Sequence, residues 1–113
     1  MKLWINNTEV PVIWEENDTV TELTQQTMRG DIVVSMTMYS DNEQVGPLGR
    51  DYVRADTQTT TQSGDIVLYS GNRIVVFYGS NQWAYTRLGH MELAPEDITA
   101  LLGSGDVTLR LTH

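Results

Sequence analysis

The chain has 113 residues, 40% of them hydrophobic and 8% aromatic, and it contains no cysteine. This length supports one domain with a single core, which can fold without a disulfide or a structural metal. Seven basic residues against fifteen acidic ones give a net charge of −8. That balance argues against nucleic acid and against an anionic membrane face as partners, because both attract basic surfaces.

The first seven residues contain one lysine, but no apolar stretch of the roughly 7–15 residues that a signal peptide needs follows them. No apolar run approaches the roughly 18–20 residues of a membrane span. The longest runs, residues 32–34 and 74–78, have the length of strands. We therefore expect a cytoplasmic protein.

A β-hairpin is the first element that the pattern predicts. Residues 2–5 and 9–14 are rich in β-branched and aromatic residues, and they flank Asn6 and Asn7, which suit a tight turn. Pro11 has no backbone donor, so we expect it at an edge or a bulge of the second strand.

A helix over about residues 20–28 is predicted next. Thr19 and Glu22 have the spacing of a capping box, and Gly30 is typical of a residue that ends a helix. From there the apolar period changes to two, which predicts a strand over residues 32–39.

A turn at residues 41–42 leads to a short strand over residues 43–45. Residues 50–63 then form a long polar segment without a core face, and such a loop is uncommon unless it binds something or is mobile. Pro95 suits the first turn of a second helix, which Gly103 ends. Alternating apolar residues predict the remaining strands over residues 65–69, 73–78, 84–92 and 107–111.

The expected total is eight strands and two short helices. Two short helices cannot cover both faces of an open eight-stranded sheet, and its free edges would invite pairing with other chains. Closing the sheet on itself removes both edges. We therefore predict a mainly β fold, a closed eight-stranded β-barrel with two short α-helices at its ends.

Four segments add a family resemblance to this pattern. They are GDIVLY at residues 64–69, RIVVFYG at 73–79, YTRLGHM at 85–91 and GSGDVTLRL at 103–111. Together with the order of the predicted elements, they resemble the small bacterial cyclophilin-like domain proteins. The resemblance covers residues 1–113 and implies a single cyclophilin-like domain built on the closed cyclophilin-like β-barrel.

The resemblance also bears on catalysis. Cyclophilins isomerise prolyl bonds with an arginine on the strand after the first helix and an apolar pocket for the proline ring. No arginine lies within residues 31–49 of this chain, and Arg50 follows a proline and two glycines. Phe77 and Trp83 lie in places similar to two aromatic residues of that pocket, and Tyr85 lies roughly where its histidine would be. The resemblance therefore implies a pocket without the catalytic guanidinium.

One cluster of candidate site residues combines three aromatic side chains with one arginine. Aromatic rings beside a guanidinium offer apolar area and fixed donors to an extended peptide or a flat ligand. Ordinary packing of the sheet is the alternative explanation. With two residues from the long polar segment, the predicted ligand-binding residues are Arg50, Tyr52, Tyr78, Trp83, Tyr85 and Arg87.

We therefore expect a cyclophilin-like barrel that binds a peptide or a small ligand without prolyl isomerase catalysis. One alternative is a residual peptidyl-prolyl isomerase in which Arg50 folds back over the barrel and replaces the missing guanidinium. The other is a non-catalytic assembly or interaction module. The sequence leaves the ligand and the oligomeric state open.

The remaining motifs predict no cofactor and no metal site. Residues 29–31 spell the integrin-binding tripeptide Arg-Gly-Asp, but the end of a helix followed by a strand accounts for them better. His90 has no second metal ligand at a suitable spacing. The acidic residues 15–18 and 41–43 lack the spacing of a calcium loop. Residues 103–106 are rich in glycine, but they follow a helix where a phosphate loop would precede one.

Overall fold

The computed structural model describes residues 1–113, and it contains eleven strands and two helices. The N-terminal half contains β1 (Lys2–Ile5), β2 (Thr8–Val10), β3 (Val12–Trp14), α1 (Asp18–Thr27), β4 (Ile32–Ser35), β5 (Thr37–Tyr39) and β6 (Glu43–Pro47). The C-terminal half contains β7 (Thr57–Thr60), β8 (Asp65–Tyr69), β9 (Arg73–Phe77), β10 (Gln82–Met91), α2 (Pro95–Leu102) and β11 (Thr108–Thr112). Neither helix is long and apolar enough to cross a membrane.

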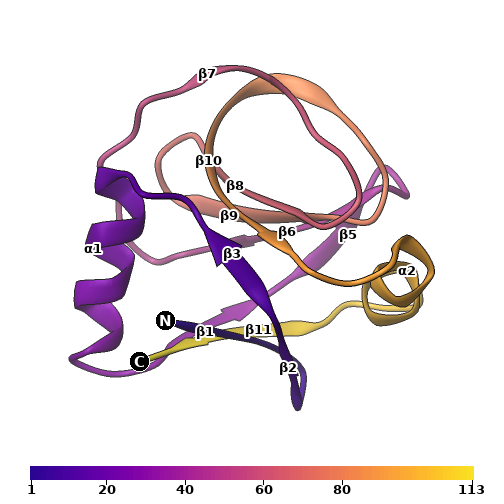
Figure 1. Cartoon of the computed structure of the whole chain (residues 1–113), viewed down its shortest axis with the longest axis horizontal. Coiled ribbons are helices and arrows are strands. Elements are labelled where there is room, and N and C mark those ends of the chain that lie inside the picture. Colours follow the sequence, from indigo (N-terminus) through magenta and orange to yellow (C-terminus); the bar gives the residue numbers. More distant parts are fainter.

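The strands form two sheets, so the fold is mainly β with two helices, as predicted, but the closed eight-stranded barrel is not confirmed. The smaller sheet has the order β2-β1-β11-β4, and the larger one has the order β3-β10-β8-β9-β6-β5, with β7 paired to β10. Figure 1 shows the smaller sheet below the larger one, with α1 and α2 at opposite ends of the space between them.

Two breaks in the strands explain why the hydrogen-bonded ladder does not close. Pro11 separates β2 from β3, and it has no N–H to continue the ladder. Met36 separates β4 from β5, and its N–H donates to the Val107 carbonyl at 2.9 Å. At each break the chain passes from the smaller sheet to the larger one. The predicted strands over residues 9–14 and 32–39 are therefore two bent segments, each shared between the sheets.

A glycine permits the close approach of strands at the second break. A Cβ placed on Gly46 of β6 would lie 2.5 Å from Val34 Cγ1 and 2.8 Å from the Ser35 carbonyl oxygen. Because no real Cβ sits that close to a backbone atom, only glycine lets β6 approach the bend between β4 and β5 in this way.

The main core lies between the two sheets and both helices contribute to it. Leu3, Ile66 and Leu109 are fully buried there, and α2 adds Ile98 and Leu102. From α1, Val20 and Leu23 complete the packing. The hydrophobic effect of this shared core holds the two sheets face to face without a continuous ladder.

The first helix begins differently from the prediction. Its N-cap is Asn17, whose side chain accepts a hydrogen bond from the Val20 N–H at 2.9 Å. The predicted capping pair instead holds the long polar segment against the helix. The Thr19 hydroxyl donates to the Val53 carbonyl at 2.5 Å, and the Glu22 carboxylate accepts from the Val53 N–H at 2.7 Å.

Part of the long polar segment is a strand and not a loop. Residues 57–60 form β7, which pairs antiparallel with residues 82–85 of β10. The prediction of an irregular segment over residues 50–63 is therefore wrong for these four residues, because threonine is β-permissive and β10 supplies an edge to pair with. Figure 1 shows β7 and the first half of β10 arching away from the rest of the larger sheet.

Candidate functional site

A second, smaller apolar cluster lies on the face of the larger sheet that is turned away from the main core. The even-numbered apolar residues of β8 and β9 enter the main core, whereas Val67, Val75 and Phe77 point to the opposite face. Tyr85, from the arching half of β10, packs on top of them and is 3% exposed. The arch therefore covers part of this face and leaves the rest open.

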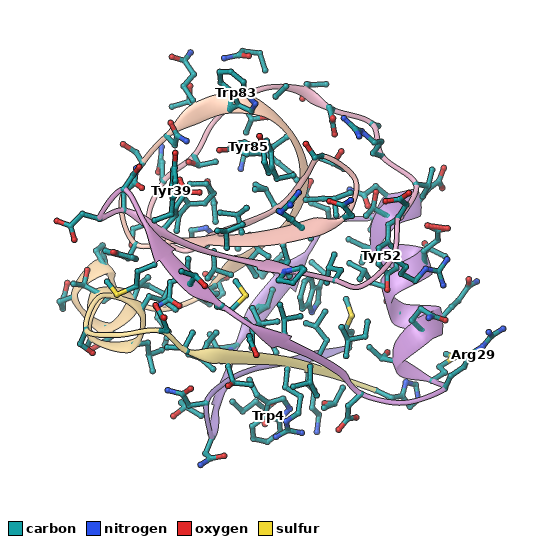
Figure 2. All side chains as sticks on the ribbon, turned by 180° about the vertical axis from the view of Figure 1, so that it is seen from behind. Trp4, Arg29, Tyr39, Tyr52, Trp83 and Tyr85 are labelled. Atoms are coloured by element: carbon teal, nitrogen blue, oxygen red, sulfur yellow. The ribbon has the colours of Figure 1, made fainter.

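Beside this cluster lies a cavity of about 430 Å³. It is lined by Tyr39, Glu43, Val45, Tyr69, Arg73, Asn81, Trp83 and Tyr85. Four of these eight side chains are aromatic and come from three different strands. Figure 2 shows Tyr39, Tyr85 and Trp83 gathered at one end of the molecule, far from Trp4 and Arg29. A concave surface with aromatic walls and a few polar groups is the usual form of a ligand site.

Tyr85 forms the best-fixed wall of the cavity. Its ring meets Tyr69 edge-on at 6.0 Å between centroids and Phe77 at 5.9 Å. Its hydroxyl accepts a hydrogen bond from Asn81 Nδ2 at 3.0 Å. Burial raises the pKa of Tyr85, and the nearby Glu43 carboxyl adds to this effect. The hydroxyl is therefore a neutral donor and acceptor at physiological pH.

Glu43 places a carboxyl group in the wall next to Tyr85. It is only 5% exposed, and its single side-chain partner is Asn81 Nδ2 at 3.4 Å. Burial raises the pKa of Glu43, and the hydrogen bond from Asn81 lowers it by less. A carboxyl group with one long hydrogen bond has unused capacity to accept or, when protonated, to donate a hydrogen bond.

Trp83 and Tyr39 form the exposed rim of the cavity. They are 57% and 61% exposed, which places them among only six large hydrophobic side chains that the fold leaves open to solvent. The indole N–H groups of Trp4 and Trp14 donate to Thr112 Oγ1 and to the Met1 carbonyl, respectively. The Trp83 N–H has no partner within the chain. Trp83 therefore offers both apolar area and a free donor.

Of the six predicted ligand-binding residues, the structure brings only Trp83 and Tyr85 together in this cavity. Tyr52 is 5% exposed and belongs to the main core, and the Arg50 guanidinium lies over its ring at 4.9 Å. Tyr78 packs against the main core near the end of α2, where its ring edge lies 3.6 Å from a Cβ placed on Gly103. These three residues lie outside the cavity because they occupy other faces and loops.

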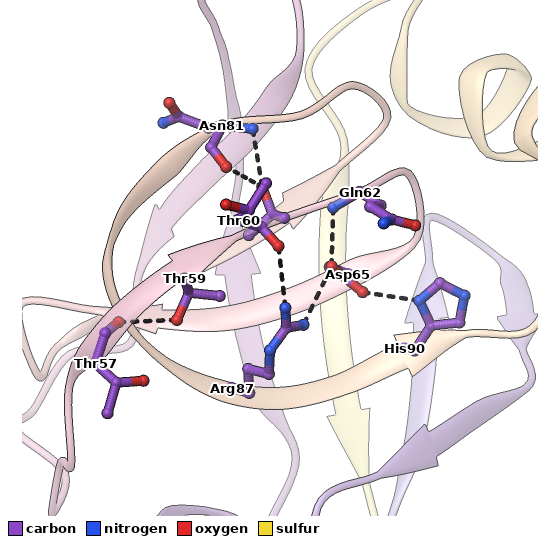
Figure 3. A network of polar contacts seen from close by, with 9 residues as sticks. Thr57, Thr59, Thr60, Gln62, Asp65, Asn81, Arg87 and His90 are labelled. Atoms are coloured by element: carbon purple, nitrogen blue, oxygen red, sulfur yellow. Dashed lines mark hydrogen bonds and ion pairs between the residues drawn. The ribbon is translucent and has the colours of Figure 1, made fainter.

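Arg87 belongs to a separate polar network on the far half of β10 (Figure 3). Its guanidinium donates to the Thr60 carbonyl at 3.0 Å and forms an ion pair with Asp65 Oδ2 at 3.2 Å. The other oxygen of Asp65 contacts His90 Nδ1 at 2.8 Å. Asp65 also accepts from the Gln62 N–H at 2.8 Å. This network therefore attaches the turn that precedes β8 to strand β10.

Sequence reasoning missed six lining residues: Tyr39, Glu43, Val45, Tyr69, Arg73 and Asn81. A signal for part of this site is present, because β8 and β9 are apolar at even and odd positions alike. Strands that are buried on both faces have continuous apolar runs in the sequence. Val67, Val75 and Phe77 are the residues that make the runs of β8 and β9 continuous. It indicates a second covered face, but it does not say which polar residues border it.

The chain as a whole matches the cyclophilin-like family over residues 3–112. It therefore belongs to the cyclophilin-like family, which confirms the resemblance to a cyclophilin-like domain protein. No curated protein and no solved structure matches the chain.

Proposed function

We propose that this protein binds a small ligand or a short peptide in the cavity between β6, β8 and the arch of β10, without prolyl isomerase catalysis. The observation that carries the proposal is the convergence of Tyr39, Tyr69, Trp83 and Tyr85 on one cavity of about 430 Å³. Aromatic walls supply most of the apolar area that a flat group buries on binding. The carboxyl of Glu43 and the free N–H of Trp83 supply polar contacts.

The absence of isomerase activity is proposed on the position of the arginines. In the cyclophilins that the sequence resembles, a guanidinium stabilises the proline amide as it loses resonance. Here residues 31–49 hold no arginine. Arg50 lies over the Tyr52 ring and donates to the Asp51 carbonyl at 3.4 Å, and it does not line the cavity. Arg73 does line the cavity, but it lies on β9 and not on the strand that follows the first helix.

Binding is tested by intrinsic fluorescence against a panel of aromatic amino-acid derivatives and short peptides. We expect at least one compound to change the emission of the wild type and of Trp4→Phe. The same compound should leave the emission of Trp83→Phe unchanged, because the two other indoles lie elsewhere. A panel without effect on any of the three proteins would count against the proposed function.

Catalysis is tested by a protease-coupled assay on a peptide with one X-Pro bond. We expect the rate of cis-to-trans conversion to equal the uncatalysed rate at micromolar protein. Acceleration that is lost in Arg73→Gln, but kept in Arg29→Gln, would replace the proposal with an isomerase that draws its guanidinium from β9.

A further inference from the structure

Three of the six arginines have no carboxylate partner, and two of these three lie beside the cavity. Arg54, Arg87 and Arg110 form ion pairs with aspartates. The other three are Arg29, Arg50 and Arg73. In a chain with fifteen acidic residues against seven basic ones, two neighbouring guanidiniums without an ion pair leave a local positive site on an acidic protein.

Arg50 and Arg73 line one surface hollow of about 330 Å³, together with Pro47, Gly49, Asp51 and Asn72. Arg50 donates to a backbone carbonyl at 3.4 Å, and Arg73 donates to Asn72 Oδ1 at 3.3 Å. Asp51 also borders the hollow, where its Oδ1 accepts from Asn72 Nδ2 at 3.2 Å. Its carboxylate is thus held by an amide, while both guanidiniums keep most of their donors free.

Arg73 lines the aromatic cavity as well as this hollow, so the two adjoin at its side chain. The strand register gives the positions of Glu43 and Arg73 along the sheet. Glu43 of β6 pairs with Phe77 of β9, whereas Arg73 pairs with Pro47, which lies four residues after Glu43 on the antiparallel β6. At about 3.3 Å per residue, Glu43 and Arg73 lie roughly 13 Å apart along the sheet. The backbone positions of Glu43 and Arg73 are therefore well separated along the strands that line the cavity.

We infer that the ligand is an aromatic carboxylate, whose ring lies between Tyr69 and Trp83 and whose anionic group reaches Arg73 and Arg50. This inference rests on the proposed function of the cavity. The planar forks of two arginines match a carboxylate in shape and charge. Glu43 lies away from this anionic group, and the two guanidiniums outweigh the one carboxylate of Asp51 that borders the hollow. The carboxylate of the ligand can belong to a free aromatic acid or to the C-terminus of a peptide.

The test compares acid and amide pairs of the same ring: the N-acetyl derivatives of phenylalanine, tyrosine and tryptophan with their N-acetyl amides. Binding is followed by calorimetry on the wild type, Arg50→Gln, Arg73→Gln and, as a control with the same change of charge, Arg29→Gln. We expect the wild type to prefer at least one acid over its amide by about tenfold, the ratio that a hydrogen bond to a charged group supplies.

Arg73→Gln and Arg50→Gln should bring this ratio towards one while the amide still binds, and Arg29→Gln should leave it unchanged. Equal binding of acid and amide by the wild type would overturn the inference and leave the proposed function standing. An equal loss in Arg29→Gln would also overturn it, because overall charge would then explain the preference. If no acid and no amide binds, the proposed function itself fails.

Two further probes distinguish the sources of the carboxylate. A tetrapeptide that ends in the preferred residue is compared with the N-acetyl amino acid. Tighter binding of the tetrapeptide assigns the site to a peptide C-terminus, and equal binding assigns it to a small acid. Either result supports the inference if the tetrapeptide amide binds more weakly than the tetrapeptide acid.

Discussion

The Gln44 side chain and the Val107 backbone, 63 residues apart along the chain, are joined by a 3.1 Å hydrogen bond in which the Val107 N–H donates to Gln44 Oε1. Gln44 is fully buried, and its amide nitrogen donates to the carbonyls of Leu102 and Gly105 at 2.6 and 2.8 Å. One side chain of β6 thus satisfies three backbone groups in the link from α2 to β11.

Gln44→Leu should therefore be strongly destabilising. It leaves three backbone groups without a partner, and each buried group left unsatisfied costs about 1–3 kcal/mol. We expect the free energy of unfolding, measured by urea denaturation, to fall by at least about 3 kcal/mol. Gln58→Leu is the matched control, because Gln58 is exposed on β7, and it should change the free energy by less than about 0.5 kcal/mol. Similar effects of both variants would contradict this account.

The approach of β6 to the bend between β4 and β5 makes a second prediction. Gly46→Ala places a Cβ 2.5 Å from Val34 Cγ1 and 2.7 Å from Met36 Sδ. Overpacking of this kind costs about 1–3 kcal/mol, or more when backbone must shift. A Cβ on Gly30 meets nothing within 4 Å, so Gly30→Ala should leave the thermal midpoint nearly unchanged. A Gly46→Ala protein as stable as Gly30→Ala would show that the two sheets do not meet here.

The Asp65 network predicts that replacing Asp65 lowers the stability of the fold more than replacing Asp31. Asp65 is 6% exposed and accepts from Arg87, His90 and the Gln62 backbone. Asp65→Ala removes the acceptor that these three donors share and should cost about 1–3 kcal/mol of stability. Asp31→Ala removes one exposed ion pair at 3.6 Å with Arg110 and should cost less than about 1 kcal/mol. Chemical denaturation of the two variants measures both costs, and equal losses would refute the network's role.

Burial of Glu43 predicts a pH dependence of stability. Its pKa in the folded state is raised above the ordinary value of 4.5, so the folded protein keeps the proton to higher pH than the unfolded chain. The free energy of unfolding therefore falls as the pH rises from about 4.5 through the folded-state pKa. Glu43→Gln should remove this part of the fall, and the exposed Glu92→Gln should not. Parallel pH profiles for Glu43→Gln and the wild type would contradict the assignment.

The sequence predicts the position of most elements but not how the strands are divided between sheets. The alternation over residues 32–39 continues without interruption through Met36, so no local signal marks the bend there. Whether Pro11 only bends the second strand or ends the ladder depends on β10, which lies about 80 residues further along the chain. Which distant strands pair is decided by packing, so the local sequence pattern does not predict the pairing.

The candidate site could likewise be predicted only in part from the sequence. Trp83 and Tyr85 stand out in the sequence because aromatic residues cluster there, and both line the cavity. Glu43 and Arg73 were missed because each is a single charged residue at the end of a strand, a place where charged residues are ordinary. The Asp65–His90 contact was missed for a similar reason, since it joins β8 and β10 across 25 residues.

Binding in the aromatic cavity is best followed by a nitrogen–proton correlation spectrum of the tryptophan indoles during titration with the preferred N-acetyl aromatic acid. The chain has three tryptophans, and the Trp83→Phe variant assigns its own signal by removing it. We expect the Trp83 signal to shift with a saturable profile while the signals of Trp4 and Trp14 stay in place. Equal shifts of all three signals, or a Trp83 signal that does not move at saturating ligand, would contradict binding in the aromatic cavity.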